Sequence, residues 1–256
     1  MIDLKNNNSD NVVISVKDLS VQYDNRTILE NVCFNVYSGE VVVIVGGSGC
    51  GKSTLLRQLI GLEKPTSGTI IINGNNLTDA NENETINIMN KNGVLFQFNG
   101  LFASMTLEEN IALILEKYTG LTPSQMKDAI DLKLSLVGLS GFQNYKPAEI
   151  SGGMKKRAAL ARAMALDPEI LFFDEPSSGL DPITSASLDN LIKEINNSLK
   201  TTMVIVSHDL ESILTISHRI IMLDASVKGI LATGTPDELK NYKENKNVYN
   251  FFNRRL

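Results

Sequence analysis

An apolar run leads into a glycine-rich turn in the stretch Val41-Val42-Val43-Ile44-Val45-Gly46-Gly47-Ser48-Gly49-Cys50-Gly51-Lys52-Ser53-Thr54. The run is mostly β-branched, which is typical of a strand buried on both faces of a parallel sheet. Glycines at Gly46 and Gly51 let backbone N–H groups turn inward around phosphate oxygens, and the following helix start adds unpaired donors. In this pattern Lys52 is expected to reach the β- and γ-phosphates and the Ser53 hydroxyl to bind Mg²⁺. The stretch therefore predicts a site for a nucleoside triphosphate.

Length and composition indicate an ordinary globular protein. The chain has 256 residues, 43% of them hydrophobic and 21% charged, and a net charge of −5 that offers no basic field for nucleic acid. No stretch reaches the ~18 apolar residues of a membrane span, so we expect any membrane association to go through a partner or a surface. Residues 1–10 lack the layout of a signal peptide and are expected to fray. Cys33 and Cys50 show no disulfide or metal spacing, which suits a reducing cytosol.

Apolar patterning predicts alternating strands and helices, interrupted by a helical stretch. Strands are expected at residues 12–21, 32–37, 41–45, 69–72, 94–97, 170–173, 203–206 and 220–223. Helices are expected at residues 55–60, 107–118, 123–137, 154–166 and 183–199, and residues 75–92 as a loop with a short helix. Thr106, followed by Glu109, has the signature of a capped helix start. Residues from about 99 to 165 therefore form a helical subdomain inserted into an α/β chain.

Two acids follow the apolar strand expected at residues 170–173. Ligands of α/β sheets gather at the carboxyl ends of the strands, so Asp174 and Glu175 should lie beside the phosphate loop, residues 46–53. Asp174 can hold Mg²⁺ through water, and Glu175 can orient and deprotonate an attacking water. The alternative is an ordinary strand that ends in a solvated acidic turn.

A second candidate anion site lies at Ser151-Gly152-Gly153, before a helix that carries Lys155, Lys156 and Arg157. The simpler interpretation is an N-cap with flexible glycines, followed by a solvated basic helix face. One nucleotide does not need two such sites on one chain. A head-to-tail dimer would use both, with each nucleotide between the phosphate loop of one copy and Ser151-Gly152-Gly153 of the other.

In the order and spacing of its motifs, the sequence resembles the nucleotide-binding subunit of an ABC transporter over nearly its whole length. Residues 46–53 match the Walker A loop, 171–175 the Walker B strand, Ser151-Gly152-Gly153 the signature, Gln97 the Q-loop, Ser178-Gly179-Leu180-Asp181 the D-loop, His208 the H-loop and Tyr23 the adenine-stacking aromatic. The resemblance implies an α/β P-loop NTPase (RecA-like) core with an antiparallel β subdomain and an inserted α-helical subdomain. It implies a nucleotide-binding domain at residues 11–240, with its core at 11–98 and 166–240, its helical subdomain at 99–165 and a C-terminal tail at 241–256.

The resemblance also implies a role for each motif. Glu175, His208 and Gln97 would serve catalysis, and Ser53, Gln97 and Asp174 would hold Mg²⁺. ATP would be bound by Tyr23, Gly46, Gly47, Ser48, Gly49, Cys50, Gly51, Lys52, Ser53 and Thr54 of one copy and by Ser151, Gly152, Gly153 and Asp181 of the other. For Tyr23 an ordinary surface or core position is the alternative, and for His208 a simple polar cap.

Longer stretches at residues 96–102, 151–163 and 174–184 resemble the ATPase of Mla-type, MCE-associated phospholipid transporters. The signature departs from the usual Leu-Ser-Gly-Gly-Gln at Ile150 and Met154, and the subfamily shares Met154 and the closing Phe251-Phe252-Asn253-Arg254. The resemblance implies an ATPase on the cytoplasmic face of the inner membrane that drives phospholipid movement between inner and outer membranes. Its partners would be a second copy, an integral membrane permease, an MCE-type substrate-binding protein and a small STAS-domain protein.

Two other readings of the function stay open. One is the ATPase of another ABC transporter, which imports a small solute or exports a lipoprotein. The other is a soluble ABC ATPase that acts on nucleic acid, although the chain is acidic and has neither a long coiled-coil insert nor tandem halves. Lipid species and direction of transport are not encoded in this chain, because the substrate path lies in other subunits.

Three further features have two interpretations each. Apolar residues at Phe98, Leu101, Phe102, Met105 and Leu107 would form a groove for a permease helix or be buried inside the helical subdomain. The aromatic-rich tail at residues 241–256 would dock on a neighbouring subunit or on its own domain. Cys50 lies near a helix N-terminus that favours the thiolate, so we expect thiol reagents to inactivate the protein unless ATP protects it.

Overall fold

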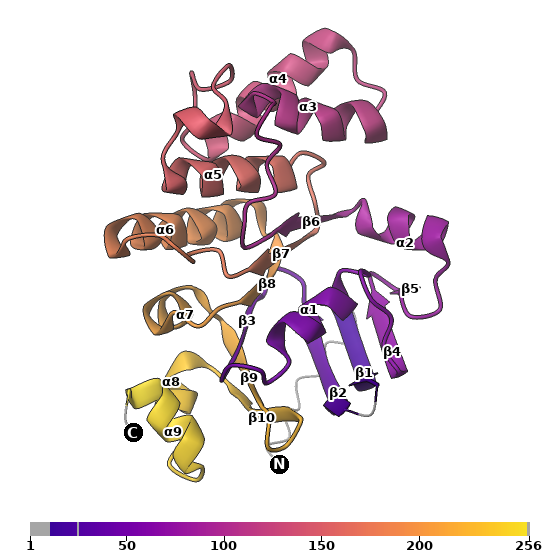
Figure 1. The fold of residues 1–256 in the computed structure, drawn as a ribbon, viewed down its shortest axis with the longest axis vertical. Coiled ribbons are helices and arrows are strands. Elements are labelled where there is room, and N and C mark those ends of the chain that lie inside the picture. The colour runs from indigo at the N-terminus through magenta and orange to yellow at the C-terminus, as the bar shows by residue number, and fades with distance from the viewer. Residues whose placement is uncertain (1–10, 25, 255–256) are drawn as a thin grey trace.

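The computed structural model describes residues 11–24 and 26–254 (Figure 1). The expected frayed end at residues 1–10, the centre of the 24–26 turn and the last two residues of the tail lie outside the described residues. Two sheets organise the described chain. The larger contains, in spatial order, β10 (Gly229–Gly234), β9 (Arg219–Asp224), β3 (Val41–Gly46), β8 (Thr202–Val206), β7 (Ile170–Asp174) and β6 (Asn92–Leu95). The smaller contains β2 (Arg26–Tyr37), β1 (Val12–Tyr23), β4 (Ser67–Ile72) and β5 (Asn75–Asn76).

The strand β3 lies inside the larger sheet, with parallel neighbours β8 and β9. Its residues alternate between two cores. Val41, Val43 and Val45 face the core that contains the longer helices, whereas Val42 and Ile44 face the core that contains α1 and the smaller sheet. Burial on both faces explains why this strand reads as a continuous apolar run.

Helices cover both faces of the larger sheet (Figure 1). Their bounds are α1 (Lys52–Leu59), α2 (Glu82–Met89), α3 (Leu107–Tyr118), α4 (Pro123–Leu136), the 3₁₀ turn η2 (Pro147–Glu149), α5 (Gly152–Ala163), α6 (Pro182–Leu199), α7 (Leu210–Ile216), α8 (Pro236–Lys240) and α9 (Lys246–Asn253). None of the helices in residues 11–24 and 26–254 has the length and hydropathy of a membrane span. The expected mixed α/β architecture is confirmed.

Helix start signals act as the sequence predicts. The Thr106 hydroxyl accepts from the Glu109 backbone N–H, and the Glu109 carboxylate accepts from the Thr106 N–H, which completes a capping box. The helices α3, α4 and α5 stack beyond α6 at one end of the molecule (Figure 1). Their inward side chains, such as Ile111 and Leu134, join the same core as one face of β3.

Several elements differ in extent from the prediction. The strand β6 spans Asn92–Leu95 rather than 94–97, so Gln97 lies beyond it, and α1 spans Lys52–Leu59 rather than 55–60. The strand β2 begins at Arg26 rather than at residue 32, because Val21, Gln22 and Tyr23 of β1 pair with it in a hairpin. The helix α5 begins at Gly152 rather than at Met154, because Ser151 caps it.

The C-terminal segment packs on its own chain. Val248 and Phe252 on α9 are 0% and 2% exposed and join the core beside α8. Of the two interpretations of the tail, burial on its own domain therefore accounts for the inner face of α9, and docking on a neighbouring subunit stays a prediction for its outer face.

Candidate functional site

The phosphate loop connects β3 to α1 and requires glycine at both ends. Gly46 has φ 147°, and a Cβ there would lie 2.3 Å from the carbonyl oxygen of Leu223. Gly51 has φ 100°, and a Cβ there would lie 2.8 Å from Cδ2 of Leu29. Between them Gly47, Ser48 and Gly49 are exposed. The loop thus presents backbone at its crown, as a phosphate-binding turn requires.

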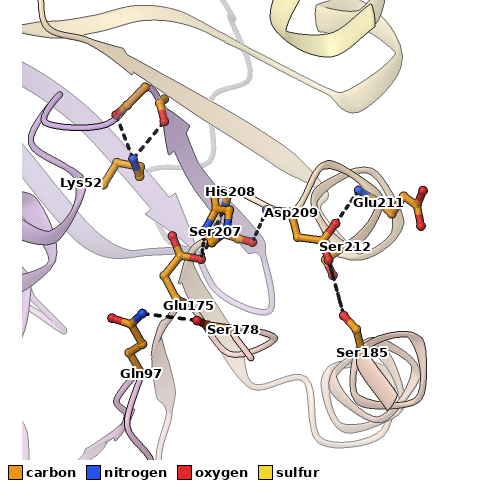
Figure 2. A network of polar contacts seen from close by, with 12 residues as sticks. Lys52, Gln97, Glu175, Ser178, Ser185, Ser207, His208, Asp209, Glu211 and Ser212 are labelled. Carbon is orange, nitrogen blue, oxygen red and sulfur yellow. Dashed lines mark hydrogen bonds and ion pairs between the residues drawn. The ribbon is translucent and has the colours of Figure 1, made fainter. Parts of the chain in front are cut away.

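Lys52 is already directed at this loop. Its Nζ atom donates to the carbonyl oxygens of Gly46 at 2.9 Å and Gly47 at 3.0 Å (Figure 2). Ser53 and Thr54 follow in the first turn of α1, and Ser53 is exposed. A lysine held across the loop stabilises the loop shape and places a cation where phosphate oxygens would come.

Cys50 does not have the environment that was expected. Its side chain is 2% exposed, and burial raises the pKa of the thiol despite the nearby Lys52 ammonium. The expectation of a favoured thiolate is wrong, because desolvation of the charged form outweighs the helix N-terminus. The exposed thiol is Cys33.

The two acids after β7 have different surroundings. Burial raises the pKa of Asp174, and the neighbouring Glu175 carboxylate raises it further. Glu175 has φ 49°, and its Oε2 atom lies 2.7 Å from Nδ1 of His208 and 3.3 Å from the His208 backbone nitrogen. Figure 2 shows this pair between Lys52 and Gln97. The end of β7 and the loop after β8 thus bring a carboxylate and an imidazole into contact.

Gln97 follows β6 and completes the group. Its side-chain Nε2 donates to Oγ of Ser178 at 3.3 Å (Figure 2). Its carbonyl oxygen accepts from Nζ of Lys156 at 2.6 Å. Lys156 is 3% exposed, and burial lowers its pKa despite Asp174 and Glu175 nearby. The basic residues after the signature are therefore not simply a solvated face, and the sequence offers no local signal for this burial.

The residues expected to hold Mg²⁺ fit that ion in type. Within the described chain no protein donor bonds the Asp174 carboxylate, so its oxygens stay available to a cation. No group of three or more His, Cys, Asp or Glu side chains with metal-binding placement occurs in residues 11–24 and 26–254. A hydroxyl, a carboxylate and an amide oxygen from Ser53, Asp174 and Gln97 supply hard ligands, as Mg²⁺ prefers when it keeps several waters.

The second candidate anion site does not join this group within one chain. Oγ of Ser151 caps α5 by accepting from the Met154 N–H at 3.3 Å. The helix α5 packs in the core on one face of the larger sheet, and α1 packs in the core on the other. Within the described residues no hydrogen bond joins 151–153 to the phosphate loop. A Cβ on Gly153 would lie 2.4 Å from Cγ2 of Thr184, so α5 and α6 approach closely here.

Asp181 and Tyr23 lie at the margins of the site. Asp181 caps α6 by accepting from the N–H groups of Ile183 and Thr184 at 3.1 Å, and the hydrogen bond from the Thr184 hydroxyl lowers its pKa. Tyr23 is 42% exposed and donates its hydroxyl to Glu63, a bond that raises its pKa. Its ring is thus accessible enough for a base to stack on it.

A cavity of about 540 Å³ opens beside His208. Ser178, Gly179 and Asp209 line it together with Phe251 and Arg254 from the end of α9. The tail therefore reaches the site from its own chain, which the sequence pattern did not predict. The capping residue Asn245, before an apolar Val248 and Phe252, is the signal that could have placed this helix.

Comparisons with known proteins agree with this architecture. A family model described as ABC transporter matches residues 29–178. The probable ribonucleotide transport ATP-binding protein mkl of Mycobacterium leprae is 43% identical over 83% of this chain, and the match spans 61% of that relative's length. The intermembrane phospholipid transport system ATP-binding protein MlaF of Escherichia coli K12 is 38% identical over 89% of this chain and 84% of the relative.

Solved structures give the same result. The dimeric structure of MJ0796, a bacterial ABC transporter cassette, has a TM-score of 0.79 and 33% identity over 87% of this chain and 98% of that one. A second dimeric structure of MJ0796, in a post-hydrolysis state with ADP and Pi, has a TM-score of 0.77 and 30% identity over the same shares. The expected P-loop NTPase fold is confirmed.

Proposed function

Because the chain belongs to the ABC transporter family, we propose that it is the ATP-hydrolysing subunit of a transporter that moves phospholipid between the inner and outer membranes. The observation that supports phospholipid as the cargo is the similarity to MlaF along most of both chains. The paired Glu175 and His208 beside the phosphate loop support the hydrolytic activity.

ATP binds with its phosphates in the phosphate loop, where Lys52 leaves the Gly46 and Gly47 carbonyls for the β- and γ-phosphates. Tyr23 stacks on the adenine. Glu175, held by His208, takes a proton from the attacking water as its oxygen bonds the γ-phosphorus and the bond to the bridging oxygen breaks. Ser53, Asp174 and Gln97 would hold Mg²⁺, which neutralises charge on the phosphate oxygens.

Two copies complete each site. The helix α5, which Ser151 caps, and the helix α1, which follows the phosphate loop, pack on opposite faces of the larger sheet. This arrangement supports a site in which Ser151 to Gly153 of one chain meet the phosphate loop of another. The Ser151 N-cap of one copy then faces the γ-phosphate bound by the other, and Asp181 lies near the partner's phosphate loop. Met154 replaces the usual amide of the signature, so this contact is made without it.

The chain works at the cytoplasmic face of the inner membrane through a permease. Phe98 and Phe102, 87% and 50% exposed, give an apolar surface beside Gln97 for that partner, whereas Leu107 is 1% exposed and belongs to the core. An MCE-type protein and a small STAS-domain protein complete the complex. We assign the nucleotide-binding domain to residues 11–240, with its helical subdomain at about 99–165.

A second cargo has support from one comparison. The mycobacterial relative with the higher identity is named for ribonucleotide transport, although this chain spans about 60% of its length. The ATPase mechanism is the same in both cases, and only the membrane partners differ.

A variant that binds ATP but does not hydrolyse it tests the proposal, because it should hold two copies together around the nucleotide. Wild-type protein with ATP and Mg²⁺ should release phosphate. Glu175→Gln should bind ATP and sediment as a dimer, with phosphate release about 100-fold or more lower. Near wild-type hydrolysis in this variant would exclude Glu175 as the base. Mass spectrometry of small molecules that co-purify with the membrane complex then separates phospholipid from ribonucleotide cargo.

A further inference from the structure

We propose that Lys156 is a positioning residue for ATP hydrolysis, because its buried ammonium group bonds the main chain at both Gln97 and Glu175. This inference rests on the proposed function and adds a residue to the mechanism. Lys156 bonds the carbonyl groups of the two residues whose side chains would orient water, and within the described residues no hydrogen bond or ion pair joins it to either side chain.

The burial of Lys156 calls for an explanation. Lysine side chains are almost never fully buried unless they are paired, yet Lys156 is 3% exposed in the second turn of α5. Its Nζ atom lies 2.6 Å from the carbonyl oxygen of Gln97 and 3.5 Å from that of Glu175. Lys155, its neighbour on the same helix, is partly exposed.

The two acceptors occupy equivalent places on neighbouring strands. β6 and β7 pair in parallel, with Leu95 opposite Phe173. Gln97 and Glu175 each lie two residues beyond that pair. One ammonium group therefore sets the spacing between the two chain segments at the edge of the sheet where the site lies.

The conformation of Glu175 makes this restraint useful. Its φ of 49° is disfavoured for a residue with a side chain. Three main-chain interactions hold it: its N–H donates to Val206 at 2.9 Å, its carbonyl accepts from Ser178 at 3.1 Å, and the same carbonyl faces Lys156. The direction of the carboxylate toward His208 depends on that conformation.

Arg162 provides an internal comparison. It lies further along α5 and donates to the carbonyl oxygens of Gly100 at 2.6 Å and Asn99 at 3.2 Å. Arg162 thus anchors the same loop as Lys156, but no bond joins it to Glu175 among the described residues. A comparison of the two separates anchoring of the loop from positioning of the acid.

The kinetic test uses full-length protein with ATP and Mg²⁺. In Lys156→Met we expect kcat to fall about 10- to 100-fold, as for the loss of a bond to a charged donor. The KM for ATP should change by less than about threefold, because phosphate binding does not involve this residue. Lys156→Arg, which keeps a cation, should recover part of kcat, and the matched variant Lys155→Met should behave as wild type.

A second measurement does not depend on hydrolysis. In nucleotide-free Lys156→Met, backbone amides at residues 97–100 should exchange hydrogen about tenfold faster than in wild type, because the local opening costs less. Arg162→Met should also speed this exchange but lower kcat less than Lys156→Met does.

Each other outcome counts against the proposal. Unchanged kcat in Lys156→Met, or a fall in kcat matched by an equal rise in KM, overturns it. If Lys156→Met does not fold, Lys156→Gln takes its place, and failure of both to fold shows a purely structural role and overturns it. If wild type releases no phosphate, the proposed function fails, and unchanged exchange at 97–100 then overturns the role of Lys156 separately.

Discussion

The imidazole Nδ1 of His208 lies 2.7 Å from Oε2 of Glu175, and the backbone nitrogen of His208 lies 3.3 Å from the same oxygen. One residue thus contacts the carboxylate twice, from its main chain and from its ring. The Asp209 side chain caps α7 directly after it and accepts from the Glu211 N–H at 3.1 Å (Figure 2). The start of α7 therefore fixes where the imidazole can lie.

Substitution of His208 should separate the two contacts. An Asn side chain places an N–H donor near the position of Nδ1, and Gln places it further out. We expect His208→Asn to keep more phosphate release than His208→Gln, and His208→Ala to lose about 100-fold or more in kcat. Nucleotide affinity, measured with a fluorescent ATP analogue, serves as the control and should stay within about threefold. Equal kcat in the Asn and Gln variants would show that Nδ1 is not the atom that matters.

The thiols should react in the order that burial sets. Cys33 is exposed, whereas Cys50, within the phosphate loop, is buried and has its pKa raised by desolvation. A coloured disulfide reagent should therefore modify one thiol of native protein quickly and the other at least about tenfold more slowly. Cys33→Ser should remove the fast phase and leave hydrolysis unchanged. A fast phase that survives in Cys33→Ser would show that the loop opens and exposes Cys50.

Sequence motifs predicted the part of the site whose residues are close together in the sequence. The strand, loop and helix around Gly46 and Lys52 are contiguous, so their residue types are sufficient. The burial of Lys156 depends on two strand ends far away in sequence, at Gln97 and Glu175. The prediction for the Cys50 thiol was wrong for the same reason, because Cys50 is buried in a core that includes residues distant in sequence, such as Leu29 on β2.

Apart from β5 and η2, the elements that were not predicted are short and lie near the C-terminus. β10, α7, α8 and α9 are too brief for periodicity to identify them. Their caps were nevertheless visible in the sequence. Asp209 precedes α7, Thr235 with Glu238 forms a capping box before α8, and Asn245 precedes α9. Capping signals would have placed the three helices where hydrophobic spacing could not.

A buried carboxylate predicts how stability depends on pH. Asp189 on α6 is 5% exposed, and burial raises its pKa above the ordinary 3.8. Its Oδ1 atom has no hydrogen-bond partner among the residues that the structure describes, and Oδ2 accepts from the Ser212 hydroxyl at 2.7 Å. Between 3.8 and the raised value, the folded state binds more protons than the unfolded state, so this group makes the protein less stable as pH rises.

Asp189→Asn removes that titration. We expect the free energy of unfolding of the variant, relative to wild type, to increase as pH rises from below 3.8 to neutrality. Urea unfolding at a series of pH values measures the difference, in which the titration of other groups cancels. Ser212→Ala removes a donor that lowers the pKa of Asp189. Stability should therefore fall more steeply with rising pH in this variant than in wild type. A difference that does not vary with pH would show that Asp189 ionises equally easily in both states.

The C-terminal helix should prove to be part of the core rather than an appendage. Phe252 is 2% exposed and Val248 is fully buried, while Phe251 is partly buried and meets Phe252 edge-on with ring centroids 5.0 Å apart. Phe252→Ala should reduce the free energy of unfolding by about 3–5 kcal/mol, because it leaves a cavity in a packed core. Phe251→Ala, the matched control, should cost less than half as much, since part of its ring already faces the cavity beside His208.

Removal of residues 241–256 should weaken assembly through loss of folded protein, and the truncated protein should unfold at a lower urea concentration than wild type. If Phe252→Ala unfolds as wild type does while subunit association is lost, α9 acts chiefly between chains, and its packing on its own core contributes little.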